Sequence, residues 1–219
     1  MPPIKYLFLA ILVPVSILVP ITIGVNRYKN LGKAMNTIFF YLVLNGLISL
    51  LVRYLASYKM NNLPILHVFT ILEFLCISIF YIQTLKDKMI KRIIVSMMVI
   101  FPLACVINFM YFQDITRFNT NTRPLEALLV MIYSLLYFAQ NTNDTFEKKW
   151  EESPINWVSS GLLLYFSGAL FIFTFSNFTS ANVAAKYQQL NLLIWNIHAT
   201  LLLIMYLLFA KGFSKCTKK

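Results

Sequence analysis

The sequence predicts an all-α integral membrane protein, a bundle of seven transmembrane helices with the amino terminus outside and the carboxyl terminus inside. Hydrophobic residues make up 59% of the 219 residues and charged residues only 12%, and the mean hydropathy is +0.70. Soluble chains of this length do not have that composition. Apolar stretches of about 20 residues, the length that crosses a bilayer, recur along the chain with short loops between them.

The predicted helices form a single domain and cover about residues 5–25, 35–55, 62–84, 93–112, 123–140, 154–177 and 188–210. The first apolar segment is too long for the core of a signal peptide, so we interpret it as the first membrane helix. Pro14 and Pro20 each remove a backbone donor from this helix and are expected to bend it.

The distribution of Lys and Arg predicts the orientation. The loops expected in the cytoplasm hold Arg27, Lys29, Lys33, Lys86, Lys88, Lys91, Arg92, Lys148, Lys149, Lys211, Lys215, Lys218 and Lys219. The opposite side holds only Lys5, Arg53, Lys59, Arg117, Arg123 and Lys186. Because positive residues stay on the cytoplasmic side, the net charge of +11 is a topology signal. We therefore expect the lipid bilayer as a partner, and no nucleic acid.

Arg53 lies in the outer part of the second helix and has two open interpretations. Its long side chain can reach the membrane interface beside Tyr54 and Tyr58, which is the simpler account. Alternatively, it can pair with a carboxylate inside the membrane. The third helix supplies the first candidate for such a partner.

His67, Thr70 and Glu73 follow one another at steps of three residues, so they share a face of the third helix. Glu73 lies near the middle of the bilayer at a rise of about 1.5 Å per residue. An isolated carboxylate at that depth is costly, so Glu73 must be protonated, paired or hydrated. It is the strongest single-residue signal in the chain.

Polar residues also flank the loop between the fourth and fifth helices. Asn108 in the fourth helix is expected to hydrogen-bond a neighbouring helix. Residues 113–123 either fold over the bundle or lie in solvent. Glu126 follows Arg123 at the start of the fifth helix, where an acid favours the helix dipole and Arg123 can pair with it. We favour this structural role of Glu126 over catalysis.

The last two predicted helices differ in the residues that they place on their inner faces. Ser159, Gly161 and Gly168 on the sixth helix predict close packing against its neighbours. The seventh helix carries a stripe of polar and aromatic side chains, continued by apolar ones, which should face other helices or a water-filled cavity rather than lipid. The stripe consists of Gln188, Asn191, Trp195, His198, Leu202 and Met205.

These residues predict a cavity that opens outward. Its outer half would be lined by Arg53, His67, Asn108, Glu126, Gln188, Asn191 and Trp195, and Glu73 and His198 would share its floor. Such a site can bind a small molecule or relay protons. The alternative is a hydrogen-bond network that only holds the bundle together.

A metal site formed by His67, Glu73 and His198 is chemically conceivable, but the spacing of these residues matches no established ligand pattern. No Ser or Cys is placed beside either histidine as a nucleophile. We therefore expect neither a metal nor another cofactor. Enzymatic activity is the least favoured of the functions considered.

Three segments resemble those of small bacterial seven-helix membrane proteins of unassigned function: Leu72–Tyr81 (LEFLCISIFY), Pro154–Phe173 (PINWVSSGLLLYFSGALFIF) and Ile194–His198 (IWNIH). The resemblance implies no reaction, but it supports Glu73, Trp195, Asn196 and His198 as positions to test. We expect a location in the inner membrane of a bacterium.

Three functions remain open. The first is a sensory module that binds a small ligand from outside and signals to a separate cytoplasmic partner. The second is a transporter of small solutes or protons, and the third is a metal-dependent membrane enzyme.

Overall fold

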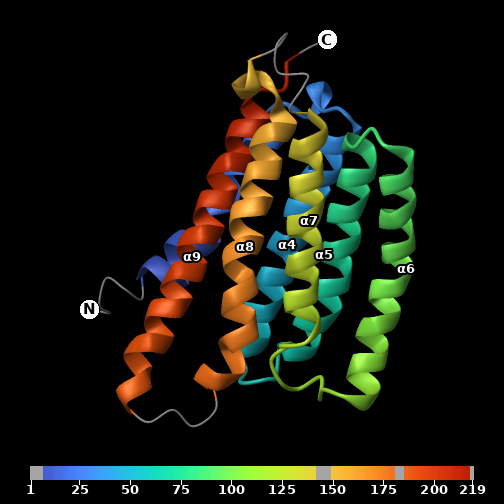
Figure 1. Cartoon of the computed structure of the whole chain (residues 1–219). Coiled ribbons are helices and arrows are strands. Elements are labelled where there is room, and N and C mark those ends of the chain that lie inside the picture. Colours follow the sequence, from blue (N-terminus) through green and yellow to red (C-terminus); the bar gives the residue numbers. More distant parts are fainter. Residues whose placement is uncertain (1–6, 142–148, 181–184, 218–219) are drawn as a thin grey trace.

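A computed structural model describes residues 7–141, 149–180 and 185–217, without the side chains of residues 175–191. The regular elements among the described residues are all helices, and seven of these helices are long and apolar enough to cross a membrane. The predicted bundle of membrane helices is therefore present. In Figure 1 the long helices run side by side along one direction, with α4 behind α7 and α8.

The first span, Phe8–Asn26, is built from three pieces rather than one regular helix. They are η1 (Phe8–Leu12), which is π-helical, α2 (Val13–Ser16) and α3 (Leu18–Asn26). The interruptions surround Pro14, whose missing N–H removes a hydrogen bond from the helix. The expected irregularity is thus present around Pro14, whereas Pro20 lies within α3, which is continuous.

The remaining elements follow the predicted order. They are η2 (Tyr28–Asn30), α4 (Lys33–Ser57), α5 (Leu63–Thr84), α6 (Lys88–Tyr111), α7 (Thr122–Asn141), η4 (Trp150–Glu152), α8 (Pro154–Ser180) and α9 (Ala185–Ser214). The largest difference is the start of α6, predicted near residue 93. Asp87 caps this helix by accepting a hydrogen bond of 2.9 Å from the backbone N–H of Ile90. The basic stretch before residue 93 therefore belongs to the helix.

The core of the bundle is aromatic, and α8 packs against both α7 and α9. The fully buried rings belong to Tyr41, Phe74, Phe80, Tyr81, Phe101, Phe166, Phe209 and Phe213. The small residues of α8 lie where α9 approaches: a Cβ added to Gly161 would come within 3.0 Å of the Phe209 ring. At Gly212 of α9, an added Cβ would lie 2.9 Å from the carbonyl oxygen of Pro154. The close packing expected for this helix is therefore confirmed.

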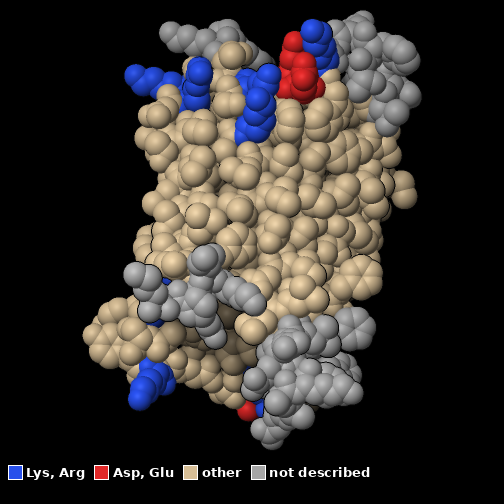
Figure 2. All heavy atoms as spheres, turned by 90° about the vertical axis from the view of Figure 1, so that its left-hand side faces the viewer, with Lys and Arg blue, Asp and Glu red and all other residues tan. Residues whose placement is uncertain are grey.

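The two ends of the bundle differ. We call the end with the carboxyl terminus, η2 and η4 the basic end, and the end with residues 58–62 and 112–121 the loop end. Figure 2 shows Lys and Arg gathered at the basic end of one face, above a broad middle band of uncharged residues. This distribution suits a bundle whose middle lies in hydrocarbon and whose ends reach the headgroups.

Candidate ligand-binding site

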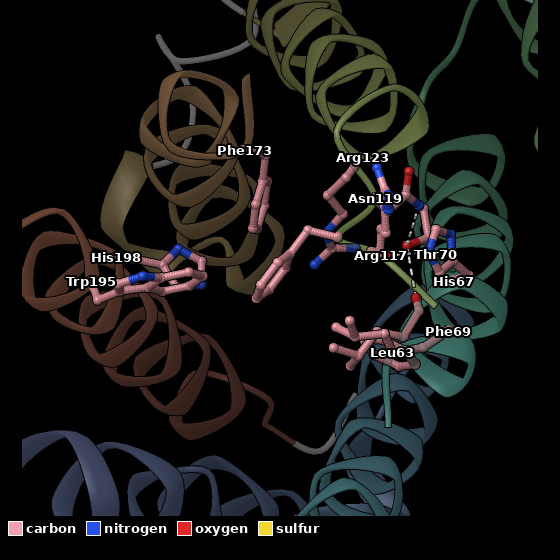
Figure 3. A pocket seen from close by; sticks show the side chains of 12 residues that line it. Leu63, His67, Phe69, Thr70, Arg117, Asn119, Arg123, Phe173, Trp195 and His198 are labelled. Carbon is pink, nitrogen blue, oxygen red and sulfur yellow. Dashed lines mark hydrogen bonds between the residues drawn. The ribbon is translucent and has the colours of Figure 1, made fainter. Parts of the chain in front are cut away.

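A cavity of about 200 Å³ lies at the loop end, between α5, α7, α8, α9 and residues 112–121. Figure 3 shows Phe173, Trp195 and His198 on one side of it, and Arg123, Asn119, Thr70 and His67 on the other. The remaining lining residues are Leu63, Leu66, Phe69, Arg117 and Phe118. The cavity therefore has an aromatic wall and a polar wall.

The segment between α6 and α7 folds over the cavity. Nε2 of His67 donates a hydrogen bond of 2.8 Å to the carbonyl oxygen of Arg117, and Nδ2 of Asn119 lies 3.5 Å from the hydroxyl of Thr70. Phe118, between these two anchors, lines the cavity. Of the two interpretations of this loop, the structure supports a cover over the bundle.

Two predicted site residues, His67 and Asn108, hold this segment in place. The ring of His67 is 1% exposed and packs edge-on against Phe109, with ring centroids 4.8 Å apart. Asn108 accepts a hydrogen bond of 2.8 Å from Nδ2 of Asn121. The prediction that Asn108 bonds a neighbouring helix is wrong, because its partners belong to the polar segment that returns over the end of α6.

His198 belongs to the aromatic wall. Its ring centroid lies 5.3 Å from Phe173, 5.4 Å from Tyr165 and 5.8 Å from Trp195. Phe118 extends the wall, 6.2 Å from Trp195. Nδ1 of His198 is buried and has no hydrogen-bond partner among the described residues. This nitrogen has almost no accessible surface, so His198 contributes its ring, and not this atom, to the wall.

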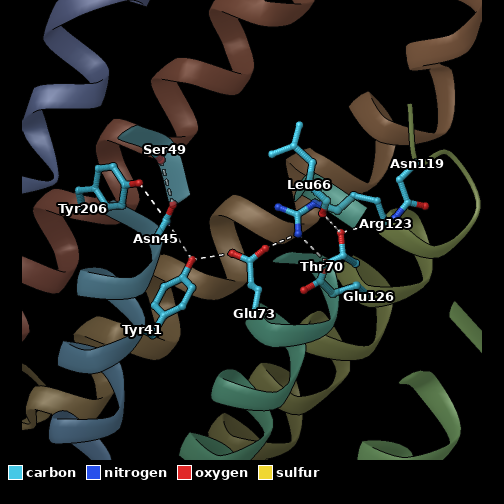
Figure 4. A network of polar contacts seen from close by, with 10 residues as sticks. All are labelled: Tyr41, Asn45, Ser49, Leu66, Thr70, Glu73, Asn119, Arg123, Glu126 and Tyr206. Carbon is cyan, nitrogen blue, oxygen red and sulfur yellow. Dashed lines mark hydrogen bonds and ion pairs between the residues drawn. The ribbon is translucent and has the colours of Figure 1, made fainter. Parts of the chain in front are cut away.

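Glu73 lies deeper and is paired. The hydroxyl of Tyr41 donates a hydrogen bond of 2.6 Å to its Oε1, and Nη1 of Arg123 binds its Oε2. The same Nη1 lies 2.6 Å from Oε2 of Glu126. Both carboxylates are buried, with 1% and 0% of their residues exposed. We call Glu73, Arg123 and Glu126 the Arg123 triad, shown in Figure 4.

The triad continues across the bundle through α4. Nδ2 of Asn45 lies 3.5 Å from the Tyr41 hydroxyl and donates a hydrogen bond of 3.2 Å to the Tyr206 hydroxyl of α9. Ser49 donates a hydrogen bond of 3.3 Å to Oδ1 of Asn45 (Figure 4). The network thus joins α4, α5, α7 and α9. The spacing of four between Tyr41, Asn45 and Ser49, which places them on one helix face, is the sequence signal that could have revealed it.

The charges of the triad do not balance. Two carboxylates share one guanidinium, so the fully ionised triad carries one net negative charge in a setting where charge is costly. A proton or a bound cation would neutralise it. Arg123 also lines the cavity, and its Cζ lies 5.0 Å from the ring centroid of Phe173. Arg123 therefore connects the cavity to the buried acids.

Not all predicted site residues come together. The proposed floor shared by Glu73 and His198 is wrong, because Glu73 binds Tyr41 and Arg123 while His198 packs against aromatic rings of α8. Arg53 is exposed and donates a hydrogen bond of 2.8 Å to the carbonyl oxygen of Ala10, not to a carboxylate.

Two further predicted residues fall where the structure gives no side chains. Gln188 and Asn191 belong to the backbone of α9, but their side chains lie outside the described residues. The lower part of the same stripe is described: Met205 is fully buried, and Leu202 packs against the core. This part of the stripe faces inward as expected.

The metal-site alternative finds no support in the described residues. Among them, no three His, Cys, Asp or Glu side chains are grouped so that they could hold an ion. His67 faces the covering segment and Glu73 faces Arg123, so these two donors do not converge with His198. Cys76, Cys105 and Cys216 are free thiols.

Comparisons with known proteins found no match to this chain among family models, curated proteins or solved structures. The function proposed for this chain therefore rests on the cavity, the triad and the helices that carry them.

Proposed function

We propose that this chain is a multi-pass receptor of the bacterial inner membrane that binds a small molecule in the loop-end cavity and signals to a separate cytoplasmic partner. The observation that carries the proposal is the cavity itself, with an aromatic wall on one side and Arg123 on the other. We place the loop end outside and the basic end in the cytoplasm, because the basic residues concentrate there.

The lining indicates the kind of ligand. A volume of about 200 Å³ is below the ~300–1,000 Å³ of sites for drug-sized molecules, so the ligand is small. Rings at the aromatic wall favour an offset or edge-on contact with a planar group. Arg123 and Asn119 provide polar groups for its substituents. We therefore expect a small neutral planar molecule with a carbonyl, because the triad already carries a surplus negative charge.

Helix α7 is the element that can pass on the binding event. It begins beside Arg123 at the cavity. At the basic end, the Tyr137 hydroxyl donates a hydrogen bond of 2.7 Å to Oδ1 of Asn156, and Oε1 of Gln140 accepts one of 2.9 Å from the backbone N–H of Lys86. A ligand that draws Arg123 away from either acid would shift this helix, and with it the loops at the basic end.

Tryptophan fluorescence tests the proposal. The chain has three tryptophans, and replacing Trp150 and Trp157 by Phe leaves Trp195 in the cavity wall as the reporter. The purified protein is titrated with benzamide and related small neutral aromatic amides. We expect saturable quenching that Phe118→Ala abolishes and that Phe112→Ala, at an exposed position outside the cavity, preserves. Quenching that is unchanged in Phe118→Ala would exclude this cavity as the site.

The surplus carboxylate of the triad supports proton-coupled transport as a second candidate. A buried acid that can gain and lose a proton is what such transporters use. Proton uptake into proteoliposomes that is lost in Glu126→Gln would favour this function. Saturable binding without any such flux would favour the receptor.

A further inference from the structure

A second hollow lies on the outer surface of the bundle, between the first span and α4. The π-helical turn, Pro14 and the break at Ile17 interrupt the first span here. The resulting groove has a volume of about 500 Å³. Its lining includes Pro14 and Ile17 of the first span and Gly46, Leu47, Leu50 and Arg53 of α4.

The walls of the groove are almost entirely aliphatic, and Leu47 and Leu50 are exposed on its surface. Gly46 keeps it open, because a Cβ there would meet only two methyl groups of the first span, both at 3.9 Å. From Val43 to Arg53 the α4 wall rises roughly 15 Å. That length is about half of the ~30 Å hydrocarbon core, the depth of one leaflet.

Arg53 supplies the only positive charge among the residues that line this groove. Its Nη1 donates to the neutral carbonyl of Ala10, and within the described part of the chain no carboxylate forms an ion pair with it. Its charge therefore remains uncompensated at the loop end of the groove. Tyr54 and Tyr58, whose ring centroids lie 4.9 Å apart on the same helix, are of the type that marks the headgroup level.

We propose that this groove binds one acyl chain of a phospholipid with an anionic head group, and that Arg53 binds the phosphate. An apolar groove as deep as one leaflet fits the acyl chain of the lipid. A guanidinium at headgroup level can bind two phosphate oxygens at once. The site uses none of the residues that line the loop-end cavity. The lipid-site proposal is therefore independent of the proposed receptor function.

Native mass spectrometry of the full chain, purified in detergent and titrated with phosphatidylglycerol or phosphatidylcholine, tests the proposal. We expect wild type to bind phosphatidylglycerol roughly fivefold more tightly, the effect of one basic residue near a charged headgroup. Arg53→Gln should abolish this preference. Lys59→Gln, which removes a charge at the same end but outside the groove, should keep it.

A second variant tests the acyl-chain part separately. Gly46→Leu fills the groove and should weaken binding of both lipids while preserving their ratio. Val99→Phe, a bulky change at an exposed position of α6, is the matched control and should bind like wild type. The proposal is overturned if Arg53→Gln keeps the preference or if Gly46→Leu binds both lipids normally. It is also overturned if Gly46→Leu abolishes a dimer instead, since the groove would then hold a second copy of the chain.

Discussion

The unequal charges of the Arg123 triad make a specific prediction about stability. Replacing Glu73 or Glu126 alone by Gln leaves the other acid paired with Arg123, so the remaining pair is neutral. We expect each single change to raise or lower the free energy of unfolding by no more than about 1 kcal/mol, the value of one hydrogen bond. Arg123→Met leaves two buried acids without their cation and should cost about 3–5 kcal/mol.

The double variant Glu73→Gln/Glu126→Gln separates this account from simple loss of contacts. It leaves a guanidinium without a counter-charge, so it should also cost about 3–5 kcal/mol. The two single changes together cost at most about 2 kcal/mol, so the double variant should exceed their sum by at least about 1 kcal/mol. The two acids thus substitute for one another, and only the loss of both exposes the buried cation.

Equilibrium unfolding by dodecyl sulfate in mixed micelles, followed by circular dichroism, measures these differences. Glu152→Gln, at an exposed acid of η4, controls for the removal of a surface charge. If either single Gln variant loses as much stability as Arg123→Met, or if the double variant equals the sum of the singles, the triad does not hold a surplus acid and the charge argument fails.

Three further outcomes are expected. Gly212→Ala should lower the free energy of unfolding by about 1–3 kcal/mol, because its Cβ would press on a backbone carbonyl of α8, whereas Gly46→Ala, also inside a helix but with no contact closer than 3.9 Å, should not lower it in the same titration. Glu73→Gln and His198→Ala should be additive within about 0.5 kcal/mol when combined, since the two side chains have different partners; a larger coupling would restore a shared site. The backbone N–H and the hydroxyl of Thr116 donate hydrogen bonds to Asp114, and these bonds hold the pKa of Asp114 below its usual range. The stabilising effect of ionised Asp114 should thus be present above about pH 4 and lost as the pH falls further. Hydrogen exchange of residues 113–121, corrected for intrinsic rates, should show this loss in wild type and no such pH dependence in Asp114→Asn.

Part of the candidate site was predictable from the chain. His67, Trp195 and His198 were predicted as inward-facing residues and line the cavity. The sequence also predicted that Glu73 is protonated, paired or hydrated, because an isolated ionised carboxylate at that depth is costly. Phe118 and Phe173 could not be recognised, because an aromatic ring in a membrane helix or its loop is as compatible with lipid as with a binding site.

The sequence by itself determined the seven spans, since hydrocarbon demands about 20 apolar residues with their backbone groups bonded within each helix. It also determined that buried charge must be compensated. Only the tertiary structure decided which partner does so: Arg53 and His198 were the candidates for Glu73, and the packing of α5 against α7 brings Arg123 to it instead. Helical periodicity gives the face on which a side chain lies, whereas the neighbour of that face depends on how all the helices pack together.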